Sequence, residues 1–198
     1  MTFREIRRKA GNKGCGSVVG RIGSFQAIVR HYVSNHRDKV QAELVSFQTE
    51  QSLSQCIRRA ACAQQPDGKR LKHQRRIPAK VLDAWARALC REENQIRSSR
   101  TFEALIEMLN KESKQFWKNG ELTVYDTALR IGAYLHLEPR VVFLHRGTRD
   151  GARVLGFDGA RPSVRPHELP REFRQLRPHE IEDCLCIYKN HLAGRLKR

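Results

Sequence analysis

Apolar residues recur at helical spacing from Phe25 onward, and this periodicity constrains the fold more than any other feature of the sequence. Phe25, Ile28, Val29 and Tyr32 follow the spacing i, i+3, i+4, i+7, and residues 40–47 continue with a second apolar run. Such spacing places the apolar side chains on one face of a helix, which a folded chain buries against its neighbours. The sequence therefore predicts a protein built mainly from packed amphipathic helices.

Capping and turn residues predict where the later helices begin. Ser52 with Gln55 forms a capping box, Pro78 suits the first turn of a helix, and Thr101 is placed to cap another. We expect further helices from Thr123 and from Pro178, whereas residues 141–144 are β-prone but short. The predicted fold class is mainly α: a compact multi-helix domain with at most a minor β element.

Glycine and charge divide the chain into an arm and a domain. Residues 1–24 are basic, contain several glycines and lack a steady period, so we expect a flexible basic N-terminal arm there. Residues 25–198 suit a single mainly helical domain with a basic loop at 67–77, which follows the turn signal Pro66-Asp67-Gly68. The chain has no apolar run of the roughly 20 residues a membrane helix needs, nor a secretory signal, so we expect a cytoplasmic protein of bacterial style.

The strong positive charge points to a polyanionic partner. Lys and Arg number 38 against 21 Asp and Glu, a formal net charge of +17. Self-repulsion at that charge destabilises the compact state, while neutralising phosphates releases counterions and favours binding. We expect a nucleic-acid partner, with DNA favoured over RNA. An anionic membrane surface is the main rival for the charge alone, and an acidic protein partner is a further alternative.

The densest basic stretch lies between Gly68 and Arg76. No acidic residue follows Asp67 within it, so its cations lack nearby partners along the chain. Arginine presents a planar fork that fits phosphate, and lysine adds a mobile point charge. The alternative is a solvated loop. The predicted main DNA contacts are Lys69, Arg70, Lys72, Arg75 and Arg76.

Two glycine-containing turns ahead of helices are predicted to hold phosphates as well. Backbone N–H groups at a helix start can bind a phosphate without reading sequence. Alternatively, the first turn is an ordinary helix connection, and Thr148 in the second is a plain helix N-cap. The residues expected at these two anchors are Lys118, Asn119 and Gly120 in the first, and Arg146, Gly147, Thr148 and Arg149 in the second.

The segment from Thr101 to Leu135, with its turn at Asn119-Gly120, resembles a helix-hairpin-helix DNA-binding element. Within it, Tyr125–Leu135 is similar to the helix of helix-hairpin-helix DNA glycosylases that holds the catalytic aspartate. The resemblance implies that Asp126 stabilises positive charge on the sugar, or activates a nucleophile, as a flipped base leaves. Alternatively, Asp126 is the acidic partner of a helix cap at Thr123.

The remaining titratable residues carry weaker signals. His145 titrates near neutrality and could serve as an acid or base, although a lone histidine is usually structural. The cysteines lack zinc-ligand spacing, and Glu180, Glu182 and Asp183 suit the acidic first turn of a helix, so we expect no metal and no cofactor. Gly68–Pro78, Gly120–Leu135 and Glu180–Lys189 also resemble segments of a bacterial protein group without an assigned activity.

The sequence thus favours a basic DNA-binding protein that contacts the phosphate backbone and acts in DNA processing or defence. The enzymatic alternative is a DNA glycosylase-like protein that uses Asp126 on a modified or damaged base. The non-nucleic-acid alternative is a protein-interaction module whose positive charge meets an acidic partner.

Overall fold

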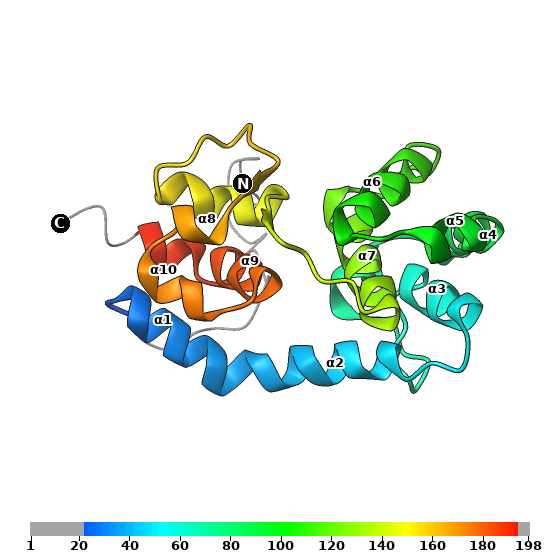
Figure 1. The fold of residues 1–198 in the computed structure, drawn as a ribbon, viewed down its shortest axis with the longest axis horizontal. Coiled ribbons are helices and arrows are strands. Elements are labelled where there is room, and N and C mark those ends of the chain that lie inside the picture. The colour runs from blue at the N-terminus through cyan, green and yellow to red at the C-terminus, as the bar shows by residue number, and fades with distance from the viewer. Residues whose placement is uncertain (1–21, 194–198) are drawn as a thin grey trace, which may run out of the picture.

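The computed structural model of the 198-residue chain describes residues 22–193, apart from the side chains of Lys72 and His73. Most of the predicted N-terminal arm therefore lies outside the described residues. The described chain is mainly helical, which confirms the predicted fold class (Figure 1). No helix in this part of the chain is long and apolar enough to cross a membrane.

Helices follow one another along most of residues 22–193. The two short strands pair antiparallel, with Val142 opposite Val164. The elements are α1 (Phe25–Tyr32), π-helix η2 (Val33–Arg37), α2 (Asp38–Gln48), α3 (Leu53–Ala61), 3-10 helix η3 (Lys72–Arg76), α4 (Ala79–Arg91), α5 (Glu93–Ser98), α6 (Phe102–Ser113), α7 (Glu121–Leu135), β1 (Val142–Phe143), α8 (Arg146–Val154), β2 (Ser163–Val164), 3-10 helices η4 (Pro166–Glu168) and η5 (Arg171–Gln175), α9 (Pro178–Ile187) and α10 (Lys189–Ala193).

Two of the predicted helix starts have the expected polar N-caps. Ser52 accepts a hydrogen bond from the Gln55 N–H at 3.2 Å, and Thr101 accepts one from the Ala104 N–H at 3.1 Å. Both predicted caps are confirmed. The predicted start at Thr123 is wrong, because Gly120 is the N-cap of α7 and Thr123 is already the third helical residue.

Buried apolar side chains form two clusters, which we call the first and second cores. The first core contains buried residues of the five helices from α3 through α7, together with Phe47 of α2. The second core contains buried residues of α1, α8, α9, α10, η5 and the two strands. The two groups of helices lie on opposite sides of Figure 1. Residues 136–141 form one connection between them.

A continuous helix formed by α1, η2 and α2 provides the other connection and runs along both groups (Figure 1). Tyr32 is buried in the second core and Phe47 in the first. The π-helical turn of η2 separates them, and such turns change the face that a helix presents. Arg37 in this turn donates two hydrogen bonds to Glu180 of α9, at 2.7 and 3.1 Å.

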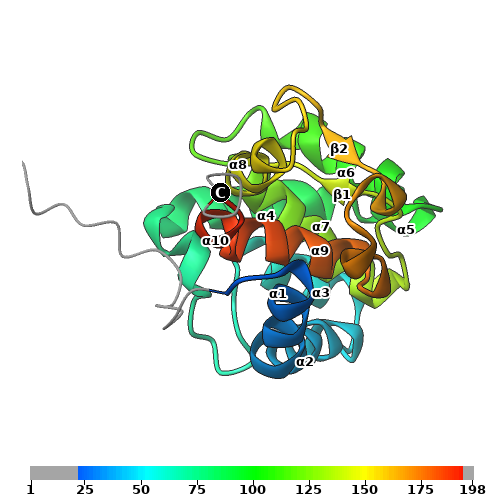
Figure 2. The same ribbon diagram turned by 90° about the vertical axis from the view of Figure 1, so that its left-hand side faces the viewer.

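Close packing of α8 against α9 depends on glycine. In the second core, α9 lies between α1 and α8 (Figure 2). A Cβ added at Gly151 would lie 2.2 Å from the Leu185 carbonyl oxygen, and one at Gly147 would lie 2.8 Å from the Cys186 Sγ. A side chain at Gly151 would force α8 and α9 apart, because the obstructing atom belongs to the backbone of α9.

We therefore expect Gly151→Ala to lower the free energy of unfolding by about 3 kcal/mol, through overpacking between α8 and α9. Chemical denaturation monitored by circular dichroism measures the change. Gly23→Ala is the matched control, since a Cβ at Gly23 meets no atom within 4 Å. Equal stability of the two variants would contradict the close approach of α8 to α9.

Candidate functional site

The predicted basic loop is a folded element with buried ends. Leu71 and Ile77 are buried on either side of η3, and the Leu71 N–H donates to the Ala63 carbonyl at 2.7 Å. Gln74 in the middle of η3 is only 2% exposed, whereas Arg75 and Arg76 are exposed. The loop is thus fixed to the protein through its apolar residues and Gln74, and presents these two arginines to solvent.

The other predicted cations of the loop have different surroundings. Arg70 donates from Nη1 to the Ile77 carbonyl at 2.7 Å and so closes the loop. Lys69 pairs with Asp67 at 2.8 Å on the surface. The side chain of Lys72 lies outside the described part of the structure. Of the five cations, Arg75 and Arg76 are therefore the two seen to be exposed without an acidic partner among the described residues.

Gln74 joins the basic loop to α7. Its Nε2 donates to Oδ2 of Asp126, and the Arg130 guanidinium lies 3.9 Å from the same carboxylate oxygen. Asp126 is in the second turn of α7, beyond the first-turn N–H groups that a capping side chain reaches. The alternative role of Asp126 as a cap partner is therefore wrong. Its side chain is 18% exposed, so it retains some contact with solvent.

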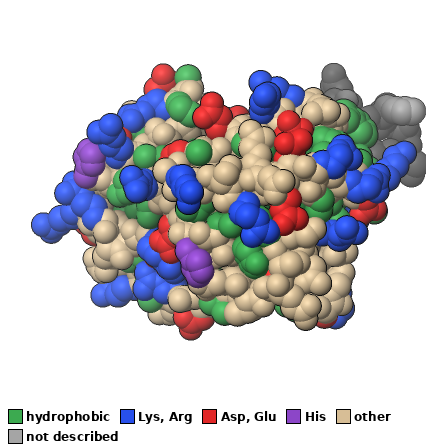
Figure 3. Space-filling model, turned by 45° about the vertical axis from the view of Figure 1, so that its right-hand side comes forward, with side chains coloured by type: hydrophobic (Ala, Val, Ile, Leu, Met, Phe, Trp, Pro, Cys, Tyr) green, Lys and Arg blue, Asp and Glu red, His purple; other side chains and the backbone are tan. Residues whose placement is uncertain are grey.

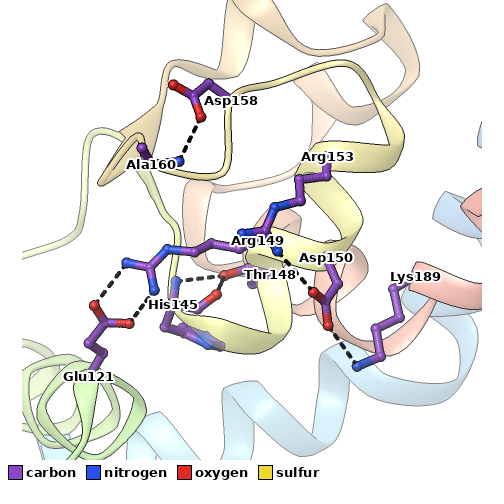
Figure 4. Close-up of polar contacts among 9 residues, drawn as sticks. All are labelled: Glu121, His145, Thr148, Arg149, Asp150, Arg153, Asp158, Ala160 and Lys189. Carbon is purple, nitrogen blue, oxygen red and sulfur yellow. Dashed lines mark hydrogen bonds and ion pairs between the residues drawn. The ribbon is translucent and has the colours of Figure 1, made fainter.

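The turn before α7 and the start of α8 meet across an ion pair. Arg149 donates to both carboxylate oxygens of Glu121, at 2.6 and 2.8 Å (Figure 4). Lys118 adopts a left-handed backbone with φ of 68°, and Gly120 is the N-cap of α7. The side-chain amide of Asn119 is buried and has no hydrogen-bond partner in the described part of the structure. The two predicted phosphate anchors thus lie close together in space.

The start of α8 differs from the expectation at Thr148. The N-cap is His145, and Thr148 is the third helical residue. The Thr148 hydroxyl accepts the His145 N–H at 2.8 Å and donates to the His145 carbonyl at 2.9 Å (Figure 4). Because Thr148 is completely buried and Gly147 packs on Cys186, the Thr148 hydroxyl cannot reach a phosphate. Arg146 is exposed, and Arg149 is held by Glu121.

His145 points into the protein toward α9 and α7. Its Nε2 hydrogen-bonds to Oε1 of Glu182, and its ring centroid lies 5.8 Å from that of Tyr125. Burial lowers the pKa of His145, but the hydrogen bond to Glu182 and the negative charges of Glu182 and Asp126 outweigh burial and raise it overall. The two predicted catalytic residues, Asp126 and His145, therefore belong to one electrostatic environment.

Together these residues form a largely buried group of polar side chains from α7, α9, η3 and the start of α8, which we call the polar centre. Its members are Gln74, Tyr125, Asp126, His145 and Glu182. Three buried atoms in it, Gln74 Oε1, the Tyr125 hydroxyl and His145 Nδ1, have no hydrogen-bond partner among the side chains and backbone that the structure describes. Such unsatisfied atoms are uncommon in proteins, because each costs free energy.

Sequence reasoning missed two members of the polar centre. Gln74 is the uncharged residue in a run of cations. Glu182 was expected in the acidic first turn of a helix, yet it is the fifth residue of α9 and only 5% exposed. Their roles depend on contacts across 52 and 37 residues of sequence, which no local pattern contains. The described residues hold no group of three or more His, Cys, Asp or Glu placed to bind a metal ion.

Glu182→Gln is expected to lower the pKa of His145. The substitution removes the negative charge of Glu182, which stabilises the protonated imidazole against the effect of burial. Folding raises the His145 pKa, so the pair contributes stability in full below the ordinary pKa of about 6.5 and loses it as the pH rises through the raised value. In Glu182→Gln, the free energy of unfolding should therefore fall less than in the parent as the pH rises above about 6.5. NMR titration of His145 and denaturation across pH measure both effects.

Asp150→Asn is the control, because that exposed carboxylate on α8 pairs with Arg153 and Lys189 away from His145 (Figure 4). It should leave the His145 titration unchanged. An unchanged titration in Glu182→Gln as well would contradict the proposed origin of the shift.

Comparison with known proteins supplies no family for this chain. No protein-family model matches it, and neither the curated proteins nor the solved structures contain a significant match. Its function is therefore inferred from the chemistry of the site.

Proposed function

We propose that this protein binds DNA through the phosphate backbone, with a surface formed around the first two turns of α7. One observation carries the proposal: the three separately predicted basic segments converge there. The basic loop reaches α7 through Gln74 and Asp126, and the start of α8 reaches it through Arg149 and Glu121. The third segment, Lys118–Gly120, leads directly into α7.

The segments that meet at α7 contain both positively charged side chains and backbone N–H donors at the start of the helix. Arg75, Arg76, Lys118 and Arg146 are exposed cations of these segments, and the first N–H groups of a helix lack intrahelical partners. A Cβ at Gly120 would meet no atom within 4 Å, so the backbone is open at the α7 N-terminus. Charged forks and helix N–H groups together suit phosphate, without selecting a base sequence.

The wider surface supports a polyanionic partner. Lys and Arg side chains are spread over the face in Figure 3, with Asp and Glu between them. The net charge of +17 supplies long-range attraction, while the convergence at α7 supplies the local contacts. DNA is preferred to RNA in the proposal because of the resemblance of residues 101–135 to helix-hairpin-helix elements.

Replacing Arg75 and Arg76 together by Gln should weaken duplex DNA binding and make it less sensitive to salt. Each lost phosphate contact removes about 0.9 from the slope of log affinity against log salt, so we expect a change of about 2. Fluorescence anisotropy with a labelled duplex at several salt concentrations measures this slope.

The double variant Arg165→Gln, Arg171→Gln is the charge-matched control. Both arginines are exposed, and both lie in the connection from β2 to α9, outside the convergence at α7. The control should retain a slope close to that of the parent. Equal slopes in all three proteins would show that the basic loop is not the contact surface.

The polar centre favours a second candidate, a DNA glycosylase-like enzyme. Asp126 lies beside the proposed DNA surface and is partly exposed. It contacts Gln74 and Arg130, each of which has a further buried polar atom without a partner among the described residues. Unpaired buried polar groups and shifted pKa values concentrate at functional sites. In base excision, the bond between the sugar C1′ and the base nitrogen breaks and water adds to C1′. Asp126 would stabilise the positive charge on the sugar or accept the proton of the water.

For this enzyme, Asp126→Asn should reduce abasic-site formation by orders of magnitude, because the carboxylate charge is lost while the Gln74 hydrogen bond can persist. DNA affinity should stay equal or rise slightly, since a negative charge leaves. Alkaline cleavage of a panel of oligonucleotides with modified bases measures the product. Asp158→Asn, at an exposed turn, is the control. Absence of abasic product with the parent across the panel would contradict the enzymatic candidate and leave the binding proposal standing.

A further inference from the structure

The turn between α6 and α7 presents a tryptophan to solvent. Trp117 is 71% exposed, and the other exposed large apolar residue in the described chain is Val45, at 45% on α2. The second tryptophan of the sequence, Trp85, is completely buried. Large aromatic side chains contribute most to stability when buried, and a tryptophan left in solvent offers its ring face to a ligand.

The residues beside Trp117 hold it in this position. Phe116 packs edge-on against Trp85, with ring centroids 5.5 Å apart, and so anchors the turn to the first core. The Asn119 N–H donates to the Phe116 carbonyl at 3.2 Å, and Lys118 has the left-handed backbone noted above. With Phe116 directed inward, the turn presents the adjacent Trp117 outward.

A cation is stacked on the exposed ring. The Lys118 Nζ lies 4.1 Å from the centroid of the Trp117 ring. A cation at this distance is attracted to the face of the aromatic ring. The nearest carboxylate along the chain, Glu121, is already engaged by Arg149. Trp117 and Lys118 therefore form a flat aromatic surface with an associated positive charge.

We propose that Trp117 and Lys118 form a stacking platform for an unpaired nucleobase. This inference rests on the proposed DNA binding and deepens it, because it assigns single-stranded or locally unpaired DNA as the preferred ligand. An unpaired base offers a face that stacks on an aromatic ring, and its flanking phosphates attract the ammonium group. A base within an intact duplex has both faces covered by its neighbours.

The chemistry of the platform fits a nucleic acid better than a protein partner. Protein interfaces centre on a contiguous, well-packed apolar patch with few charges. Trp117 has a lysine over its ring, and it lies three residues from Gly120, where the proposed phosphate surface begins. A strand whose phosphates contact Lys118 and the α7 N-terminus can therefore place an adjacent base on Trp117.

Three variants test the platform by comparing a single-stranded oligonucleotide with a duplex of equal length at one salt concentration. Trp117→Ala should weaken single-strand binding about tenfold and duplex binding less, because only the unpaired strand can stack. Trp117→Phe should restore most of the lost affinity. Val45→Ala, at the other exposed large apolar residue, should bind both forms like the parent.

Tryptophan fluorescence provides a second measurement. Single-stranded DNA should quench the emission of the exposed Trp117 in the parent, whereas Trp117→Phe retains only the buried Trp85 and should respond little. The dependence of affinity on salt should remain in Trp117→Ala, because the phosphate contacts elsewhere persist.

The outcomes separate this inference from the proposed function. Salt-dependent DNA binding with equal single-strand affinities for the parent and Trp117→Ala would overturn the platform alone. Failure of the parent to bind either form of DNA would overturn the proposed function, and the platform with it. Equal weakening of Trp117→Ala toward single-stranded DNA and toward polyglutamate would also overturn base stacking, in favour of an acidic protein partner.

Discussion

The cost of burying carboxylates organises the region where the two cores meet. A buried carboxylate destabilises a protein unless a hydrogen-bond donor or a positive charge accompanies it. Here each partner comes from a distant part of the chain, so each pair also fixes one element against another. The pairs are Asp126 with Gln74 of η3, Glu180 with Arg37 of η2, Glu182 with His145 of α8, and Asp183 with Tyr32 of α1.

These pairs, together with the apolar contacts of the two cores, hold η3, α8 and the long helix in place. Removing one partner would leave a charge in a poorly solvated place, which is why such contacts are strongly coupled. Burial and the charge of Glu182 raise the pKa of Asp183, which neighbours the polar centre on α9, so protonation is favoured at that residue. An acidic centre thus lies under a surface whose charge is mainly basic.

The proposed function combines a polyanion-binding surface with partly exposed and buried acidic groups beneath it. Under the proposed DNA binding, Arg75 and Arg76 attract phosphates beside α7, whereas Asp126 lies in the second turn of that helix. The exposed Trp117 extends this surface with an aromatic ring. In the proposed function, phosphate attraction, base stacking and the partly exposed Asp126 carboxylate are linked through α7 and the turn before it.

The sequence by itself determined the mainly helical fold, the caps at Ser52 and Thr101 and the exposed position of the cations at 75 and 76. These features depend on apolar periodicity, on hydrogen bonds within one turn and on the solvation of charge, which are local properties. The sequence did not reveal the start of α7, where glycine serves as the cap in place of Thr123.

Only the tertiary structure decided which polar residues are buried together. Gln74 and Asp126, like His145 and Glu182, become partners because distant helices bury them in the same place. Gly147 was expected to let a phosphate approach the backbone. In the structure, the space beside its Cα is occupied by Cys186 of α9. Side-chain pairing across the chain depends on how the helices pack, and helix packing is not encoded in any single stretch of residues.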